Sequence, residues 1–234
     1  MITLIGVGHV FAIADSVKEV IRSKRPEVVC LELDPARYEA LLHKDEERSV
    51  PLQYRLLAYF QTRMADKFGS QVGDEMLAAA EAAGEVGAKV ALIDMDAAGV
   101  FAQLWRRMSF REKLGLFGGA LMGLFASKER VEEEMTRYEG NEAQYIDTLG
   151  EGFPTIKEVL IDDRNRHMSD TLKSLAAEHP NIVAVVGDGH VPGLMEQLKS
   201  VGAEAIRLKD LRSSKGQTSP SGSEVTTSFW YHSP

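Results

Sequence analysis

The chain has 234 residues, 44% of them hydrophobic, and a net charge of −8. That length suits one α/β domain with an insertion, and the acidic balance without a basic stripe argues against a nucleic-acid partner. Cys30 is a lone cysteine, so an internal disulfide is excluded and a reducing, cytoplasmic compartment is favoured. No run reaches the ~20 apolar residues of a membrane-spanning helix. Met1 leads directly into a strand-like run, unlike a signal peptide.

The first predicted unit is a strand, a helix and a second strand. Ile2–Ile5 is an apolar run closed by glycine, 16–25 has helical spacing, and 27–33 is rich in β-branched residues. Asp15 is placed to cap the helix. The short joins favour a parallel strand pair with a right-handed crossover.

The rest of the chain continues this alternation. Helical sequence over about 36–150 forms an insertion that a third strand interrupts near 88–94. The elements predicted after it are a helix over roughly 155–178, a strand from 181, a helix after 191 and a strand over 203–208. One domain over 1–212 is therefore expected. Residues 213–234 are Ser/Gly-rich and indicate a flexible tail or linker.

One motif occurs near both ends of the chain, as LIGVGH (Leu4–His9) and VVGDGH (Val185–His190). Each copy joins a strand to a helix, at the edge of a parallel sheet where ligands bind. If the two strands are neighbours, His9 and His190 meet in one pocket, where imidazoles serve as metal ligands or bases. The alternative is that both cap helices or face a phosphate in a turn. Neither copy has the third glycine of a dinucleotide motif.

Acidic residues end two of the predicted strands. Glu32 interrupts an apolar run and shares a face with Cys30, and a buried carboxylate requires a partner. A metal, an arginine or a substrate amine would serve as the partner of Glu32. The alternative without a functional role is a simple salt bridge to Arg37. Two histidines and one carboxylate form a three-ligand set that leaves a position for water. Asp94 and Asp96 could join a metal site, but they are more simply expected to cap the next helix.

A dense polar segment, IDDRNRHMS, lies in the helix predicted over 155–178. Asp163 and His167 are one turn apart and face the same way. Such a segment is usually a solvated helix face. A function requires Arg164 or Asn165 to turn inward and bind an oxyanion or a carboxylate.

The apolar run 114–126 has glycines at every fourth position and basic residues on both sides. This pattern favours a buried helix or one that a second subunit covers, as in a homo-oligomer. A segment lying in a membrane interface is the alternative.

Together these motifs resemble the TraB/PrgY/TIKI family. GVGH and GDGH are similar to its paired Gly-x-x-His motifs, and CLELDPAR to its glutamate-bearing strand. DDRNRHMSDTL resembles its Glu-Arg-Asn-x-x-Met segment, with Asp163 where the family has glutamate. The resemblance covers about residues 2–212. It implies an α/β fold related to ChaN and erythromycin-esterase-like proteins, with a mixed, largely parallel central sheet of about five or six strands, flanking helices and a large helical insertion.

The resemblance also implies metal-dependent proteolysis, favouring manganese or cobalt, and control of a peptide pheromone in prokaryotes. We therefore expect a metal-dependent hydrolase, most simply a peptidase that acts on a peptide signal. His9, His190 and Glu32 would hold Mn, Co or Zn, with Glu32 as third ligand or as the base for water. The other expected catalytic residues are Arg164, Asn165, Arg37 and Asp163.

Two alternatives belong to other functional classes. The same pocket could bind a peptide or small ligand without turnover, in a regulator associated with a membrane. The glycine pattern could instead mark an assembly or membrane-surface scaffold. Membrane association would use residues 114–126 or a C-terminal region beyond this chain, which the resemblance to prokaryotic members implies.

Overall fold

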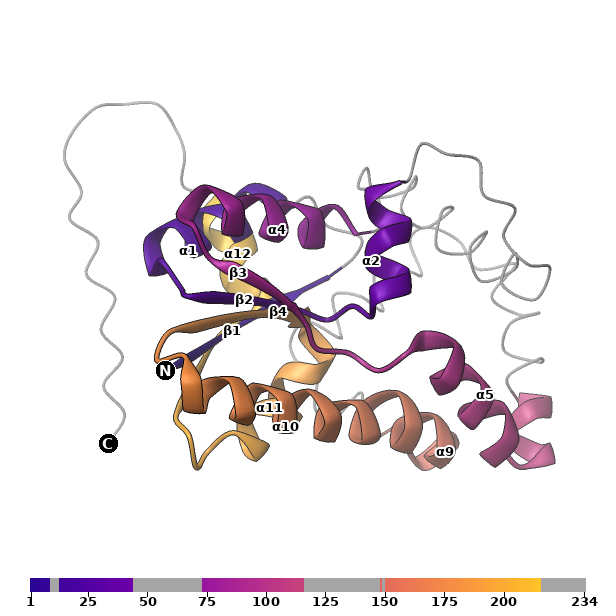
Figure 1. Cartoon of the computed structure of the whole chain (residues 1–234). Coiled ribbons are helices and arrows are strands. Elements are labelled where there is room, and N and C mark those ends of the chain that lie inside the picture. Colours follow the sequence, from indigo (N-terminus) through magenta and orange to yellow (C-terminus); the bar gives the residue numbers. More distant parts are fainter. Residues whose placement is uncertain (9–12, 44–72, 116–147, 149, 216–234) are drawn as a thin grey trace.

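A computed structural model describes residues 1–8, 13–43, 73–115, 148 and 150–215. Its centre is a five-stranded sheet with helices on both faces (Figure 1). The strands are β1 (Ile2–Val7), β2 (Val28–Leu31), β3 (Lys89–Leu92), β4 (Ile182–Gly187) and β5 (Ala203–Ile206). Their order is β3-β2-β4-β1-β5, and each neighbouring pair is parallel. The expected α/β class is confirmed.

The strand order places the two glycine motifs side by side. β4 lies between β1 and β2, and its register pairs Ile2 with Ile182 and Val7 with Gly187. The two motifs therefore leave the sheet at the same level of its C-terminal edge. On the other side of β4, Leu31 pairs with Val185, so Glu32 follows at that edge. The sheet thus gathers residues from both ends of the chain.

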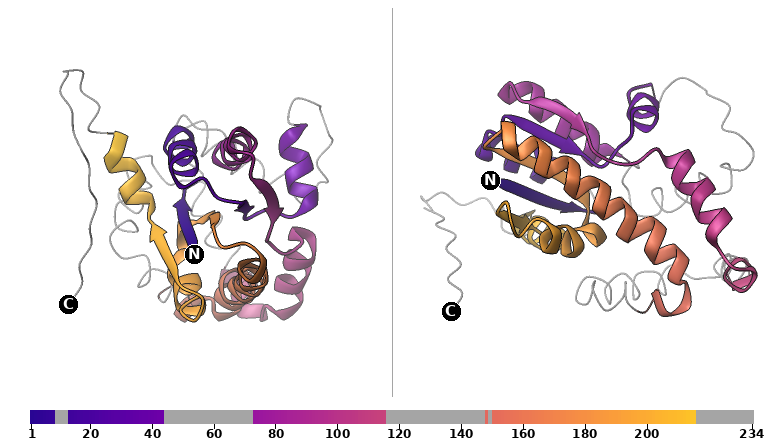
Figure 2. Two further views of the ribbon diagram at one scale, coloured as in Figure 1. Left: turned by 60° about the vertical axis from the view of Figure 1, so that its left-hand side comes forward. Right: turned by 60° about the horizontal axis from the view of Figure 1, so that its bottom comes forward.

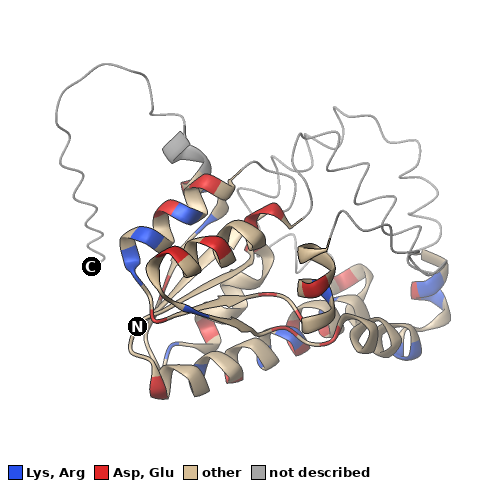
Figure 3. Ribbon diagram, turned by 45° about the horizontal axis from the view of Figure 1, so that its top comes forward, with Lys and Arg blue, Asp and Glu red and all other residues tan. Residues whose placement is uncertain are grey.

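One face of the sheet is covered by α1 (Ala14–Lys24), α4 (Asp74–Val86) and α12 (Leu208–Lys215) (Figure 1; Figure 2, left). Val17 and Ile21 of α1 pack on the sheet beside the alanine-rich face of α4, because their spacing puts them on one side of the helix. Figure 3 shows charges of both signs on these helices. At the surface, Lys18 pairs with Glu81 at 2.5 Å and Arg22 with Glu85 at 2.6 Å.

The opposite face is covered by α10 (Asp163–Glu178) and α11 (Val191–Gln197). Met168 and Leu172 of α10 bury their side chains against Leu4 and Cys30. A short helix, α9 (Pro154–Lys157), and one π-helical turn (Glu158–Asp162) run directly into α10. Such turns insert an extra residue into a helix and often occur at functional sites. Here the turn ends two residues before Arg164.

Two helices, α2 (Pro35–Leu42) and α5 (Ala97–Arg107), lie beyond the C-terminal ends of the strands (Figure 1). Asp96 caps α5 as expected, accepting a hydrogen bond from the Gly99 N–H at 2.7 Å. The cap expected from Asp15 is wrong: α1 begins at Ala14, so Asp15 lies in its first turn. There its charge still complements the positive end of the helix dipole.

Several expectations concern residues outside the described ranges. His9, most of the apolar run 114–126 and the tail after residue 215 belong to this group. The described parts of the insertion are α2, α4, β3 and α5 with the short helical stretch after it. Of the described helices, none is long and apolar enough to cross a membrane.

Candidate functional site

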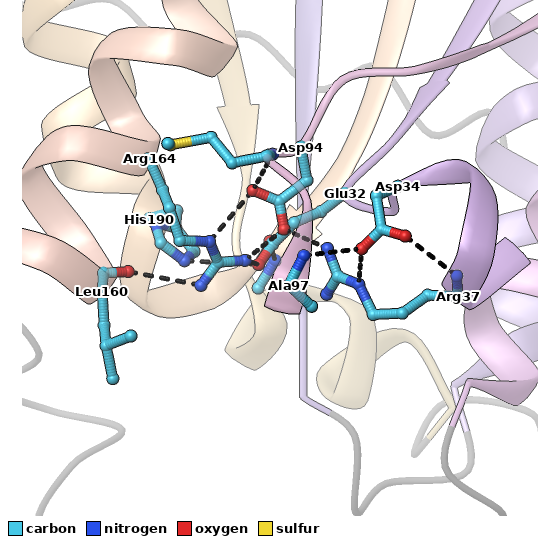
Figure 4. A network of polar contacts seen from close by, with 10 residues as sticks. Glu32, Asp34, Arg37, Asp94, Ala97, Leu160, Arg164 and His190 are labelled. Carbon is cyan, nitrogen blue, oxygen red and sulfur yellow. Dashed lines mark hydrogen bonds and ion pairs between the residues drawn. The ribbon is translucent and has the colours of Figure 1, made fainter. Parts of the chain in front are cut away.

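Polar residues that follow three neighbouring strands meet at the C-terminal edge of the sheet (Figure 4). Glu32 follows β2, Asp94 follows β3, and His190 follows β4 in a short 3₁₀ turn (Asp188–His190). Arg164 and Asn165 reach them from the first turn of α10. All five side chains are largely or fully buried. The edge where parallel strands end is thus occupied by a compact polar cluster.

Glu32 is the centre of this cluster. Its Oε2 accepts a hydrogen bond from the Gly187 N–H at 2.5 Å, and its Oε1 pairs with Arg164 and lies 3.3 Å from His190 Nε2. Burial alone would raise the pKa of Glu32, but the facing His190, the Arg164 charge and the Gly187 N–H together hold that pKa well below its usual value. Glu32 is therefore a carboxylate at neutral pH.

The orientation of His190 is set by Asn165. His190 Nδ1 lies 2.8 Å from Asn165 Oδ1, and an amide oxygen can only accept a hydrogen bond. Nδ1 therefore carries a proton, and Nε2 is the ring nitrogen that faces Glu32. Gly193 of α11 makes the contact sterically feasible, because a Cβ at that position would lie 2.3 Å from Asn165 Nδ2.

Asp94 bridges two arginines. Arg164 donates to Asp94 through Nε at 3.0 Å and Nη2 at 2.6 Å, while Arg37 donates to it from α2. Arg37 also bonds Asp34, the N-cap residue of α2, at 2.6 Å. Burial would lower the pKa of Arg164, but Asp94 and Glu32 raise that pKa above its usual value. Positive and negative groups thus alternate from Glu32 to the start of α2.

The structure brings together most of the predicted site residues. Glu32, Arg164, Asn165 and His190 are in direct contact in pairs, whereas Arg37 joins the cluster through Asp94. The salt bridge considered between Glu32 and Arg37 is replaced by one to Arg164. Arg164 also donates to the Leu160 carbonyl of the π-helical turn, at 3.2 Å.

Asp163 lies apart from this cluster. Its carboxylate accepts hydrogen bonds from Gln103 at 3.1 Å and from Arg107 and Arg166 at 3.0 Å. Gln103 and Arg107 belong to α5. In this arrangement Asp163 joins α10 to α5, while its neighbour Arg164 faces the sheet edge.

Reasoning from the sequence missed two contributors, Asp34 and Gly193, and preferred another role for a third, Asp94. Asp94 was expected to cap a helix but instead holds both arginines. Asp34 caps α2 and also accepts the Ala97 N–H of α5 at 3.2 Å, so it ties both helices to the cluster. Gly193 makes room for Asn165. For Asp94 a signal existed, because it follows a strand just as Glu32 does.

Glu32 and His190 fit two positions of a metal site. Two ligands bound at ~2.0–2.2 Å to one tetrahedral ion lie about 3.3–3.6 Å apart, and Glu32 Oε1 and His190 Nε2 are 3.3 Å apart. The described residues contain no group of three His, Cys, Asp or Glu side chains placed to hold a metal ion. His9, the expected third ligand, lies outside the described ranges. Arg164 contacts the same Glu32 oxygen as a metal would.

Comparison with known proteins identifies the family of the chain. Residues 1–207 match the TraB/PrgY/gumN family. The chain is also 35% identical over 216 residues to the uncharacterized protein MJ1365 of Methanocaldococcus jannaschii. The aligned region covers 86% of this chain and 54% of that protein. The chain thus spans about half the length of this curated relative. With a match over most of its length, the chain belongs to the TraB/PrgY/gumN family.

Proposed function

We propose that this protein is a divalent-metal-dependent hydrolase whose ion is held by Glu32, His190 and His9. The observation that carries the proposal is the buried Glu32–His190 pair, whose 3.3 Å spacing suits two ligands of one ion. Asn165 supports it, because metal-binding histidines ordinarily donate their other ring N–H to an oxygen acceptor. Mn, Co and Zn are the ions expected.

A bound ion of this kind lowers the pKa of a coordinated water and polarises a carbonyl group. The residues of the chain prepare for it. Glu32 stays ionised because its pKa is lowered, so no proton has to leave it before a cation binds. The Asn165 contact engages Nδ1 and so leaves Nε2, which faces Glu32, as the His190 nitrogen for a metal ion.

Arg164 is suited to stabilise a developing oxyanion. Arg164 donates two hydrogen bonds to Asp94 and one to the Leu160 carbonyl. These bonds would hold the guanidinium in position if Glu32 bound a metal ion instead of Arg164. Arg164 Nη2, which donates to Glu32 in this structure, would then be a charged donor at the same edge. Arg37 supports this by holding Asp94 from the other side.

For the substrate we propose a peptide, as the resemblance to proteolytic relatives implies. This part of the proposal rests on analogy within the family rather than on a contact. A specific observation favours a second candidate, a binding protein without turnover. Arg164 already pairs with Glu32, so this carboxylate has a cationic partner without an ion, and Arg164 could recognise a peptide carboxylate instead.

Metal titration of the full chain tests the proposal. Binding of Mn²⁺, Co²⁺ and Zn²⁺ should weaken by tenfold or more in His190→Ala, Glu32→Gln and His9→Ala. His179→Ala is the matched control, since His179 Nδ1 lies 3.1 Å from Glu27 Oε2 before the strands begin. Its titration should equal that of the unmodified chain.

The same titration separates the two candidates. If none of the three site variants weakens binding of any of these ions, the proposed metal site is wrong. If a panel of peptides binds in an Arg164-dependent manner and none is cleaved with any of the ions, the protein is a binding protein.

A further inference from the structure

Asp188, inside the second glycine motif, has a separate set of partners that the proposed chemistry does not use. Its buried carboxylate accepts hydrogen bonds from Arg207 Nε at 2.9 Å and from Arg207 Nη2 at 2.7 Å. It also accepts the Leu208 N–H at 3.0 Å. Arg207 and Leu208 lie where β5 passes into α12. Asp188 therefore connects the end of β4 to the end of β5, an outer strand of the sheet.

Gly6, in the first glycine motif, leaves the space that this carboxylate fills. A Cβ at residue 6 would lie 2.2 Å from Asp188 Oδ1 and 3.1 Å from Val191 Cγ2. Cβ atoms in proteins essentially never lie within 3.0 Å of a non-bonded heavy atom from another part of the chain. The two motifs therefore interlock: the glycine of one accommodates the aspartate of the other. This gives the repeat a structural reason that is separate from its histidines.

The same turn presents His190. Asp188 begins the 3₁₀ turn that His190 ends, and the residue before it, Gly187, donates its N–H to Glu32. The turn is thus attached to Glu32 at its start and to Asn165 at its end. Asp188 supplies the third attachment, through a two-pronged bond to a guanidinium. Such a bond restrains orientation as well as distance.

We propose that Asp188 and Arg207 are positioning residues for His190, and that Gly6 serves by leaving room for their pair. The proposal rests on the proposed function, because it concerns how His190 is held for its ligand. With the pair intact, His190 keeps its contact with Asn165 and one direction towards Glu32. With the pair loosened, the turn shifts and the contact with Asn165 lengthens.

The first test is Arg207→Lys in the full chain, which keeps the charge but removes the planar fork. The imidazole ¹⁵N shifts of His190, assigned by comparison with His190→Ala, should show one Nδ1–H tautomer in the unmodified chain and a mixture in the variant. Affinity for Co²⁺ alone should fall about tenfold. The matched control is Arg22→Lys, because Arg22 binds Glu85 through the same fork at 2.6 and 2.9 Å, on the exposed surface.

The second test does not depend on Arg207 and serves if that variant folds poorly. Gly6→Ala should lower the melting temperature strongly in the unmodified chain, but much less in the Asp188→Ala background, where the carboxylate is gone. Equal effects in the two backgrounds would show that Gly6 does not serve Asp188, and would overturn that part of the proposal.

The outcomes also separate this inference from the proposed function. If Arg207→Lys folds and leaves both the His190 tautomer and the Co²⁺ affinity unchanged, the positioning role is wrong. If the unmodified chain binds no metal but Arg207→Lys, unlike Arg22→Lys, still mixes the tautomers, the positioning role stands and the metal-dependent function fails.

Discussion

Two histidine–glutamate pairs lie at opposite ends of the strands in the same sheet, and they differ in burial rather than in distance. His190 Nε2 and Glu32 Oε1 are 3.3 Å apart with side chains 6% and 7% exposed. His179 Nδ1 and Glu27 Oε2 are 3.1 Å apart with side chains 18% and 48% exposed. The shorter contact is the one that water can solvate. Proximity alone therefore does not identify a functional pair.

Burial changes what each pair requires from the rest of the protein. Glu32 needs the Gly187 N–H and the Arg164 charge, since an unpaired buried carboxylate is costly. Glu27 is half exposed and can be solvated directly. The consequence is that the Glu32 edge is organised over several elements, whereas the Glu27 edge is a local surface contact. The following predictions test this difference, from the largest expected effect to the smallest.

Removing the central cation should have the largest effect on stability. Arg164→Met leaves the buried Glu32 and Asp94 without their shared partner. We expect the free energy of unfolding, measured with urea, to fall by about 3–5 kcal/mol. Arg22→Met, which removes an exposed pair with Glu85, should have a far smaller effect. Similar losses in the two variants would refute the distinction between buried and exposed pairs.

A methyl group at Gly193 should disturb the buried pair without removing any of its members. In Gly193→Ala the new Cβ displaces Asn165 from His190, and overpacking of this kind costs about 1–3 kcal/mol. The His190 ¹⁵N spectrum should show the loss of a single tautomer. Gly84→Ala on α4 is the control, because nothing lies near its Cβ and alanine there should stabilise the helix by about 0.5–1 kcal/mol. The idea fails if the His190 spectrum of Gly193→Ala is unchanged.

Glu112 extends the comparison to pH. Hydrogen bonds from the Ser109 N–H, against an opposing effect of burial, and then from Thr155 lower the pKa of Glu112 to about 2. A carboxylate whose pKa is lowered on folding contributes stability above its unfolded pKa of ~4.3, and this is lost as the pH falls towards the folded value.

The stability of the unmodified chain should therefore decline more steeply than that of Glu112→Gln between about pH 4.3 and pH 2. Urea unfolding at a series of pH values measures this. Glu85→Gln, at an exposed pair, is the reference and should differ less from the unmodified chain. Parallel curves for Glu112→Gln and the unmodified chain would contradict the lowered pKa.

The smallest effect is expected at the exposed pair of the opposite edge. Glu27→Gln should change the free energy of unfolding by less than about 1 kcal/mol, since water replaces the lost contact with His179. Thermal unfolding at pH 6 and pH 8 is sufficient to measure it. A loss as large as that of Arg164→Met would mean that exposure does not separate the two edges.

The sequence by itself determined the elements and much of the site. Apolar runs such as Ile2–Ile5 predicted the strands, because a parallel strand covered on both faces is mostly apolar. The repeated glycine motif marked two strands that would form one pocket if they were neighbours, and β1 and β4 are neighbours. Glu32 was recognisable because a carboxylate in such a run requires a partner. These are local properties, and local pattern is sufficient to read them.

The tertiary structure alone decided which groups are partners. Glu32 pairs with Arg164, 132 positions away, rather than with the nearby Arg37, because α10 crosses the sheet edge and α2 leads away from it. The π-helical turn and the packing of Met168 set the rotation of α10, so Arg164 faces the cluster while Asp163 faces α5. Asp94 became a bridge between two arginines for the same reason. Partner choice depends on strand order and helix rotation, which packing across the whole domain determines.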